Sequence, residues 1–248
     1  VSKTAVTENY VRGGDVTYVI SAVNSGSTPL TGVSITDDLG GYTFGGGTLY
    51  PLAYVVGSVR VYVNGVLQTS SPTVVFSGLT VPASGNLMLI YEARVNQFAP
   101  LGADDSIVNT AAVTASGITA PSTASATVTP DASGALTITK SIDPVSVTEN
   151  GTVTYTFIIQ NYGSGAATAE DEVSVRDTFD PILSDISVSL NETPLAVTEG
   201  YTYDQATGTF VTVPGVITVP AATFVRDTAT GAWTVTPGVT RLTVAGTL

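Results

Sequence analysis

The sequence predicts an all-β protein made of two tandem β-sandwich domains, and three observations support that prediction. Val, Thr, Ala, Gly and Ser dominate the composition, whereas only 11% of the residues are charged. β-branched side chains fit the pleated, half-buried surface of a sheet, and short alternating runs of them are separated here by Gly, Asn and Pro turn signals. The chain of 248 residues also contains one series of motifs twice, and its length suffices for two separate cores.

The repeated unit is clearest over residues 14–26 and 151–163, which share a Val-Thr-Tyr run and end on Asn followed two residues later by Gly. Thr, Ala, Ser, Gly and Pro crowd together over residues 117–134, and this composition favours a short linker. We therefore expect a first domain over residues 1–130 and a second over residues 131–248. Short strands separated by turns within each unit are typical of an immunoglobulin-like sandwich.

The second unit is expected to lack its final strand. In the first copy, a strand that ends near Val95 is followed by a strand over residues 107–114, which contains Asn109. Residues 240–248 match the strand before Asn109, and the sequence then ends. A sandwich without its last strand exposes an apolar groove and unpaired backbone groups, which form a template for strand addition. Two explanations stay open: the sequence is cut short, or another subunit donates the strand and joins copies head to tail.

Five polar residues are predicted to project into the apolar interiors of the two sandwiches. The chain has two lysines, Lys3 and Lys140, and the repeat places them at equivalent positions. Side chains alternate between the faces of a strand, and both lysines are in phase with apolar neighbours. Asp37 and its repeat Asp177 continue the apolar face of their strands in the same way. Asn109 shares a face with Ile, Ala and Val residues of the strand that contains it.

One reaction explains why Lys, Asp and Asn would meet in a core. Desolvation lowers the pKa of an ammonium group by up to about 3–5 units, which supplies a neutral amine nucleophile. A buried Asp37 or Asp177 that takes up a proton can polarise a carboxamide and shuttle protons. Attack of the Lys3 amine on the Asn109 carbonyl then expels ammonia and leaves an isopeptide crosslink, formed once per site. The competing interpretation is a buried Lys–Asp ion pair beside a hydrogen-bonding Asn.

At these residues the sequence resembles a bacterial immunoglobulin-like surface repeat, the "domain of unknown function eleven". The resemblance implies an immunoglobulin-like sandwich on a bacterial cell surface or surface appendage. The arrangement is also similar to the Lys, Asp and Asn sets of pilin and adhesin domains that form isopeptide bonds, which implies the same roles here. The motifs that carry the resemblance are Val1-Ser2-Lys3-Thr4, Ile35-Thr36-Asp37-Asp38-Leu39, Val108-Asn109-Thr110-Ala111-Ala112-Val113, Leu136-Thr137-Ile138-Thr139-Lys140 and Val175-Arg176-Asp177-Thr178-Phe179.

Composition also argues against several classes of function. A formal net charge of −12 makes nucleic acid and anionic membrane poor partners, because both repel a polyanion. The chain has no Cys and no His, so it has no disulfide, no thiolate metal site and no His general base. Acidic clusters at residues 104–105 and 170–172 lack the alternating spacing of a calcium loop. We expect no enzyme activity on a separate substrate, no cofactor and no metal.

The sequence therefore predicts a structural subunit of an extracellular, pilus-like filament built from copies of itself and strengthened by Lys–Asn crosslinks. An alternative is a surface adhesin whose loops bind a glycan or a host protein. Aromatic residues outside the repeated motifs are the candidates for such contacts, although a lone aromatic on a strand usually packs in a sandwich. These candidates are Tyr42, Phe44, Tyr50, Tyr54 and Trp233.

Overall fold

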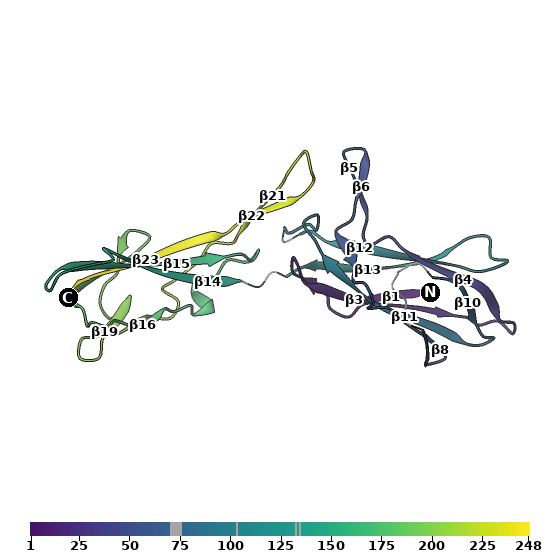
Figure 1. The fold of residues 1–248 in the computed structure, drawn as a ribbon, viewed down its shortest axis with the longest axis horizontal. Coiled ribbons are helices and arrows are strands. Elements are labelled where there is room, and N and C mark those ends of the chain that lie inside the picture. The colour runs from purple at the N-terminus through teal and green to yellow at the C-terminus, as the bar shows by residue number, and fades with distance from the viewer. Residues whose placement is uncertain (70–75, 103, 132, 134) are drawn as a thin grey trace. The chain divides into compact units, whose positions relative to one another are not determined.

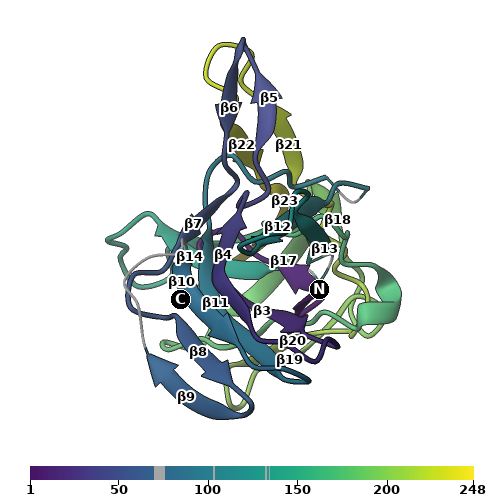
Figure 2. The same cartoon turned by 90° about the vertical axis from the view of Figure 1, so that its right-hand side faces the viewer.

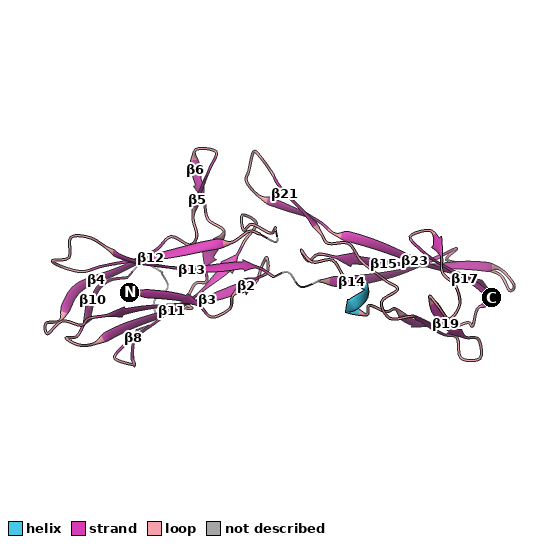
Figure 3. Cartoon of the chain, turned by 180° about the vertical axis from the view of Figure 1, so that it is seen from behind, coloured by secondary structure: helices cyan, strands magenta, loops and turns pink. Residues whose placement is uncertain are grey.

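A computed structural model of the chain describes residues 1–69, 76–102, 104–131, 133 and 135–248. Its regular structure is almost entirely strand, with one short 3₁₀ helix at Ala169–Asp171 (Figure 3). The prediction of an all-β chain with two immunoglobulin-like sandwiches is confirmed. Among the described residues, no helix has the length and apolar character to cross a membrane.

Contacts divide the chain into two compact units close to the expected boundary. Unit 1 comprises Val1–Asp131 and also Val225–Thr234, whereas unit 2 comprises Ala132–Phe224 and Val235–Leu248. The sequence pattern did not predict that Val225–Thr234 groups with unit 1. This segment joins the paired strands β21 (Thr223–Arg226) and β22 (Trp233–Thr236).

Unit 1 packs two sheets face to face (Figures 1 and 2). Alternate residues of the central strands point inward, so Val16, Tyr18 and Ile20 are buried while their neighbours are partly exposed. The first sheet has the order β1 (Ser2–Ala5), β3 (Asp15–Val23), β11 (Asn86–Val95), β8 (Arg60–Val63) and β9 (Val66–Thr69), and β7 (Leu52–Tyr54) also pairs with β11. The second has the order β10 (Phe76–Val81), β4 (Leu30–Asp37), β12 (Ile107–Thr114), β13 (Ser122–Pro130) and β2 (Asn9–Tyr10), and β5 (Tyr42–Phe44) pairs with β6 (Gly47–Leu49).

Strand β13 (Ser122–Pro130) is part of the core, so the prediction of a linker over residues 117–134 is wrong for half of its length. Strand β13 pairs along β12, and its residues Ala126 and Val128 are buried. Small Ala and Thr residues resembled a linker in composition, but they alternate as a strand requires and let the two sheets approach closely. Ala132 and Gly134 of the expected linker lie outside the described residues.

Asn24 directly follows strand β3 and ties two loops of unit 1 together. Its side-chain nitrogen donates to the carbonyl groups of Thr28 at 2.8 Å and Pro82 at 2.9 Å, and its side-chain oxygen accepts from the Gly26 amide at 3.0 Å. Asn24 is only 5% exposed, so these groups have little access to water. In unit 1 the repeated Asn-x-Gly motif therefore has a structural role: it stabilises the loops at the end of a strand.

We expect Asn24→Ala to lower the free energy of unfolding by about 2–3 kcal/mol, because it leaves several buried backbone groups without partners. Urea unfolding followed by tyrosine fluorescence measures this change. Asn9→Ala is the matched control, since Asn9 is exposed and accepts one hydrogen bond from Thr129. Equal losses in both variants would contradict the proposed role of Asn24.

Unit 2 repeats the first sheet of unit 1 but only part of the second. Its larger sheet has the order β14 (Leu136–Asp143), β15 (Thr152–Asn161), β23 (Gly238–Thr247), β17 (Ser184–Leu190) and β18 (Thr193–Pro194). A smaller sheet has the order β16 (Arg176–Thr178), β20 (Thr209–Thr212) and β19 (Tyr201–Asp204). The core between them centres on Phe157, Phe179, Phe210 and Leu242.

One edge of β16 is unpaired among the described strands of unit 2. In unit 1, β4 pairs with β10 on one edge and with β12 on the other. In unit 2, β16 pairs with β20 on one edge, and no described strand pairs with its other edge. The described chain thus contains no counterpart of β12 or β13 in this unit, as the repeat predicted.

Candidate functional site

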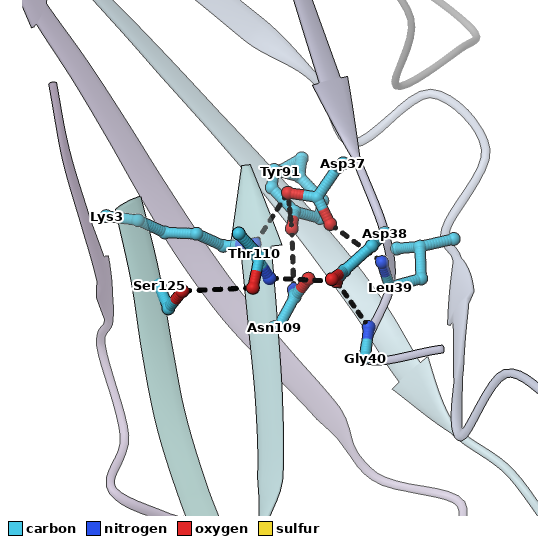
Figure 4. Close-up of polar contacts among 9 residues, drawn as sticks. All are labelled: Lys3, Asp37, Asp38, Leu39, Gly40, Tyr91, Asn109, Thr110 and Ser125. Atoms are coloured by element: carbon cyan, nitrogen blue, oxygen red, sulfur yellow. Dashed lines mark hydrogen bonds and ion pairs between the residues drawn. The ribbon is translucent and has the colours of Figure 1, made fainter. Parts of the chain in front are cut away.

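The three residues predicted for unit 1 converge between its sheets (Figure 4). Lys3 comes from β1 in one sheet, while Asp37 at the end of β4 and Asn109 on β12 come from the other. The Lys3 Nζ donates to Asp37 Oδ2 at 2.6 Å, and the two side chains are 0% and 1% exposed. Asn109 is fully buried. A lysine, a carboxylate and a carboxamide therefore share one water-excluded chamber.

Strand register places these side chains on the same inner face. Ala111 of β12 lies opposite Asp37 of β4, so Asn109, two residues earlier, projects into the chamber beside the carboxylate. Asp38 fixes this register, because its Oδ1 accepts from the backbone amides of Thr110 at 2.8 Å and Gly40 at 2.9 Å (Figure 4). The position of Asn109 is therefore set by backbone pairing and by a side-chain clamp at the end of β4.

Two tyrosines complete the chamber, and neither was predicted from the sequence. The Tyr91 hydroxyl donates to Asp37 Oδ2 at 2.8 Å and accepts from Asn109 Nδ2 at 2.9 Å, so it bridges the acid and the amide. The Tyr91 ring stacks on Tyr18 with 5.5 Å between centroids, and the Lys3 Nζ lies 4.9 Å from the Tyr18 centroid. The sequence signal for Tyr91 was a tyrosine at an inward position of β11, where the other inward residues are aliphatic.

Burial shifts the proton affinity of two side chains in the chamber. Burial lowers the pKa of Lys3, and this effect outweighs the opposing influence of the Asp37 carboxylate. Burial also raises the pKa of Tyr91, so its hydroxyl stays protonated and can donate. Within the described structure the Asn109 Oδ1 is buried and accepts no hydrogen bond. Such an unsatisfied carbonyl is costly in a core.

The corresponding pair in unit 2 is assembled but open. Lys140 forms an ion pair with Asp177, as the repeat predicted. The prediction that Lys140 is buried is wrong, however: its side chain is 39% exposed and that of Asp177 is 19% exposed. Lys140 does face the interior, where its Nζ lies 4.6 Å from the Tyr155 centroid and 5.3 Å from the Phe179 centroid. Strand periodicity predicted the direction correctly, but among the described residues no strand equivalent to β12 lies beside β16 to cover this lysine.

Unit 2 also differs from unit 1 at the bridging tyrosine. Tyr91 pairs with Tyr18 in unit 1, and the equivalent residue Tyr155 pairs with Val244 in unit 2. Val244 therefore stands in place of Tyr91. No hydroxyl group at this position bridges Asp177 to an incoming amide.

The other candidates from the sequence are the acidic clusters and the five aromatic residues. Among the described residues, no group of three or more His, Cys, Asp or Glu side chains could hold a metal ion. Of the aromatics considered for adhesion, Tyr50 is half-exposed, and the Tyr42 hydroxyl donates to the Phe98 carbonyl at 2.8 Å. The Lys3, Asp37, Tyr91 and Asn109 chamber is the site that the geometry supports.

Comparisons with known proteins do not name a family. Neither models of known protein families nor curated protein sequences give a match. Among solved structures, a type II cohesin dyad from the adaptor ScaA scaffoldin of Acetivibrio cellulolyticus aligns with 100% of this chain and 84% of its own, at 12% identity and a TM-score of 0.25. Murine CEACAM1b aligns with 86% of this chain and 84% of its own, at 14% identity and a TM-score of 0.22. The secreted serine protease VesC from Vibrio cholerae aligns with 96% of this chain and 44% of its own, at 7% identity and a TM-score of 0.27.

Proposed function

We propose that this chain is a structural subunit of an extracellular, pilus-like surface filament, and that an amide bond between Lys3 and Asn109 strengthens its first unit. The observation that carries the proposal is the buried contact set in which Asp37 bonds to Lys3 and, through Tyr91, to Asn109. A plain ion pair needs neither the tyrosine bridge nor an amide with an unsatisfied carbonyl. The fold class alone does not distinguish a structural module from a binding module.

The reaction uses groups already in the chamber. Lys3 transfers a proton to Asp37, and its neutral Nζ attacks the Asn109 side-chain carbonyl carbon to form a new C–N bond. Protonated Asp37 delivers its proton through the Tyr91 hydroxyl to Asn109 Nδ2, and it then accepts the proton that the attacking nitrogen loses. The bond from carbon to Nδ2 then breaks, and ammonia leaves. One amide bond forms, one is lost, and no outside reactant is needed.

The proposed bond would join the two sheets of unit 1. Lys3 lies in the first strand and Asn109 lies in β12 of the opposite sheet. About a hundred residues separate the two positions, and closing a loop of that length stabilises a fold by about 4–5 kcal/mol if the loop-entropy account of disulfides transfers. Tension on the chain ends would also pass through the amide bond rather than through the hydrogen bonds of β1. This property suits a subunit under mechanical load.

The filament part of the proposal rests on the open edge of unit 2. An unpaired strand edge beside an apolar groove is the arrangement that accepts a strand from another molecule. Donation from copy to copy is a head-to-tail contact, which repeats into a fibre when the rotation does not close a ring. We propose that copies of this chain assemble in this way outside the cell.

Intact-protein mass spectrometry tests the crosslink. We expect the purified chain to weigh about 17 Da less than its sequence mass, because the reaction releases one ammonia. Asn109→Ala is expected to show the full sequence mass. Asn9→Ala, which changes an exposed asparagine of β2, is expected to keep the deficit. A wild-type chain at its full sequence mass would overturn the proposed crosslink.

A further inference from the structure

Unit 1 contains a pocket that shares no lining residue with the Lys–Asp–Asn chamber. Its volume is about 360 Å³, which is close to the lower limit of ordinary small-ligand sites. Every lining residue belongs to unit 1, because the segment Val225–Thr234 is part of that unit. Aromatic walls with a few polar groups are typical of a small-molecule site. The polar and aromatic lining residues here are Tyr42, Asp105, Ser106, Arg226 and Trp233.

Arg226 carries two unused hydrogen-bond donors. Its Nε and Nη2 are buried and make no hydrogen bond within the described structure. Its guanidinium carbon lies 4.3 Å from the Phe44 ring centroid and 4.8 Å from that of Tyr42. Arg94 shows what these two nitrogens bind elsewhere in unit 1, since its Nε and Nη2 donate to the two carboxylate oxygens of Asp15, each at 2.8 Å. The same fork of Arg226 has no such partner among the described residues.

Trp233 adds a third buried donor, and backbone contacts hold it in place. Its indole Nε1 makes no hydrogen bond in the part of the chain that the structure describes. Its backbone amide donates to the Gln97 carbonyl at 2.9 Å. Arg12 donates through Nη2 to the carbonyl groups of both Gln97 and Trp233. Three buried donors without acceptors are costly, and a ligand that supplies the acceptors removes that cost.

We propose that this pocket binds an acidic sugar, a uronic acid, through its carboxylate. A planar carboxylate matches the Nε and Nη2 fork of Arg226 with two parallel hydrogen bonds. Both nitrogens are covered in the free chain, so binding turns the Arg226 side chain toward the pocket that it lines. The two charge-assisted hydrogen bonds outweigh the ring contacts that this movement loosens. The Trp233 indole N–H then donates to a sugar oxygen.

The remaining lining favours a sugar with a single negative charge over other anions. An ionised carboxylate only accepts hydrogen bonds, so Asp105 suits the hydroxyl groups of a sugar ring and repels a phosphate or a second carboxylate. The formal net charge of −12 acts against polyanions in the same direction. Tyr42 and Trp233 supply aromatic surface for the apolar face of the ring. This glycan site is a further function, which depends on neither the crosslink nor the filament.

Two sugars that differ at one carbon test the site. Methyl glucuronide carries a carboxylate where methyl glucoside carries a hydroxymethyl group. Trp233 is the only tryptophan in the sequence, so its fluorescence reports on this pocket. We expect a saturable fluorescence change with methyl glucuronide, and binding of methyl glucoside that is weaker by about tenfold or more, because the glucoside lacks the group that pairs with Arg226.

Matched variants connect the binding to the fork of Arg226. Arg226→Lys keeps the charge but removes the fork, so it should weaken methyl glucuronide binding by about tenfold and leave the circular dichroism spectrum unchanged. Arg94→Lys removes the equivalent fork from the exposed pair with Asp15, and it should bind as the wild type does. No saturable change with methyl glucuronide, equal binding of the two sugars, or wild-type affinity in Arg226→Lys would overturn the inference. Tighter binding of N-acetylglycine than of methyl glucuronide would also overturn it, because the site would then recognise a peptide carboxylate.

Discussion

Replacing Asp37 with asparagine is expected to abolish the Lys3–Asn109 bond and to lower the free energy of unfolding of unit 1 by several kcal/mol. The variant keeps the shape of the side chain but removes the only carboxylate bonded to Lys3 among the described residues. Breaking a buried ion pair on one side costs about 3–5 kcal/mol, because an ammonium group is left uncompensated. Loss of the crosslink removes a further contribution of about 4–5 kcal/mol, and the two effects need not add. Intact mass and guanidinium unfolding measure them.

The design needs a control for charge loss and one for failure to fold. Asp15→Asn removes a carboxylate from the exposed pair with Arg94, whose side chains are 32% and 58% exposed, and it should cost no more than about 1 kcal/mol. Lys3→Met also prevents the bond but leaves no ammonium in the core, so it should fold even if Asp37→Asn does not. A normal mass deficit in Asp37→Asn would contradict the role of this acid.

Tyr91→Phe is expected to slow crosslink formation by about 10²- to 10³-fold, a typical effect of removing a proton-transfer group. The hydroxyl of Tyr91 is the link between Asp37 and the leaving nitrogen of Asn109. Without this hydroxyl, no group connects Asp37 to the departing nitrogen for proton transfer. The ring itself stays, so stacking on Tyr18 and packing in the core are retained. Wild-type chain should be fully crosslinked on purification, whereas Tyr91→Phe should lose its about 17 Da slowly over time.

The matched control is Tyr18→Phe, which removes the hydroxyl of the neighbouring ring. That hydroxyl is buried and makes no hydrogen bond in the described structure, so the variant should crosslink at close to the wild-type rate. Circular dichroism should show the same fold for both variants. Full crosslinking of Tyr91→Phe at the earliest time point, or equal slowing by Tyr18→Phe, would argue against proton transfer through Tyr91.

Much of the chamber could be predicted because strand periodicity fixes the face of each side chain. Lys3, Asp37 and Asn109 are each in phase with apolar residues, and each is on an inner face in the structure. The repeat added the equivalence of Lys140 and Asp177, whose ion pair the structure contains. It also predicted that β23 matches β11.

Other features could not be predicted, because they depend on which strands become neighbours. Tyr91 lies far from Lys3 in the chain, and only the pairing of β11 with β3 and the stacking of the two sheets bring it to Asp37. Strand β13 resembled a linker by composition, and its pairing with β12 makes it part of the core. Exposure of Lys140 follows from the absence of a covering strand, which a pattern along one strand does not report.

The sequence alone therefore determined the class of the fold, the repeat and the inward direction of the reactive side chains, since these follow from the two-residue period of a strand. Only the tertiary structure decided which groups touch, because contact depends on register between strands and on the packing of two sheets. It closed one lysine site with a tyrosine bridge and left the other open to water. The difference between a fully buried lysine and a partly exposed one lies in that packing.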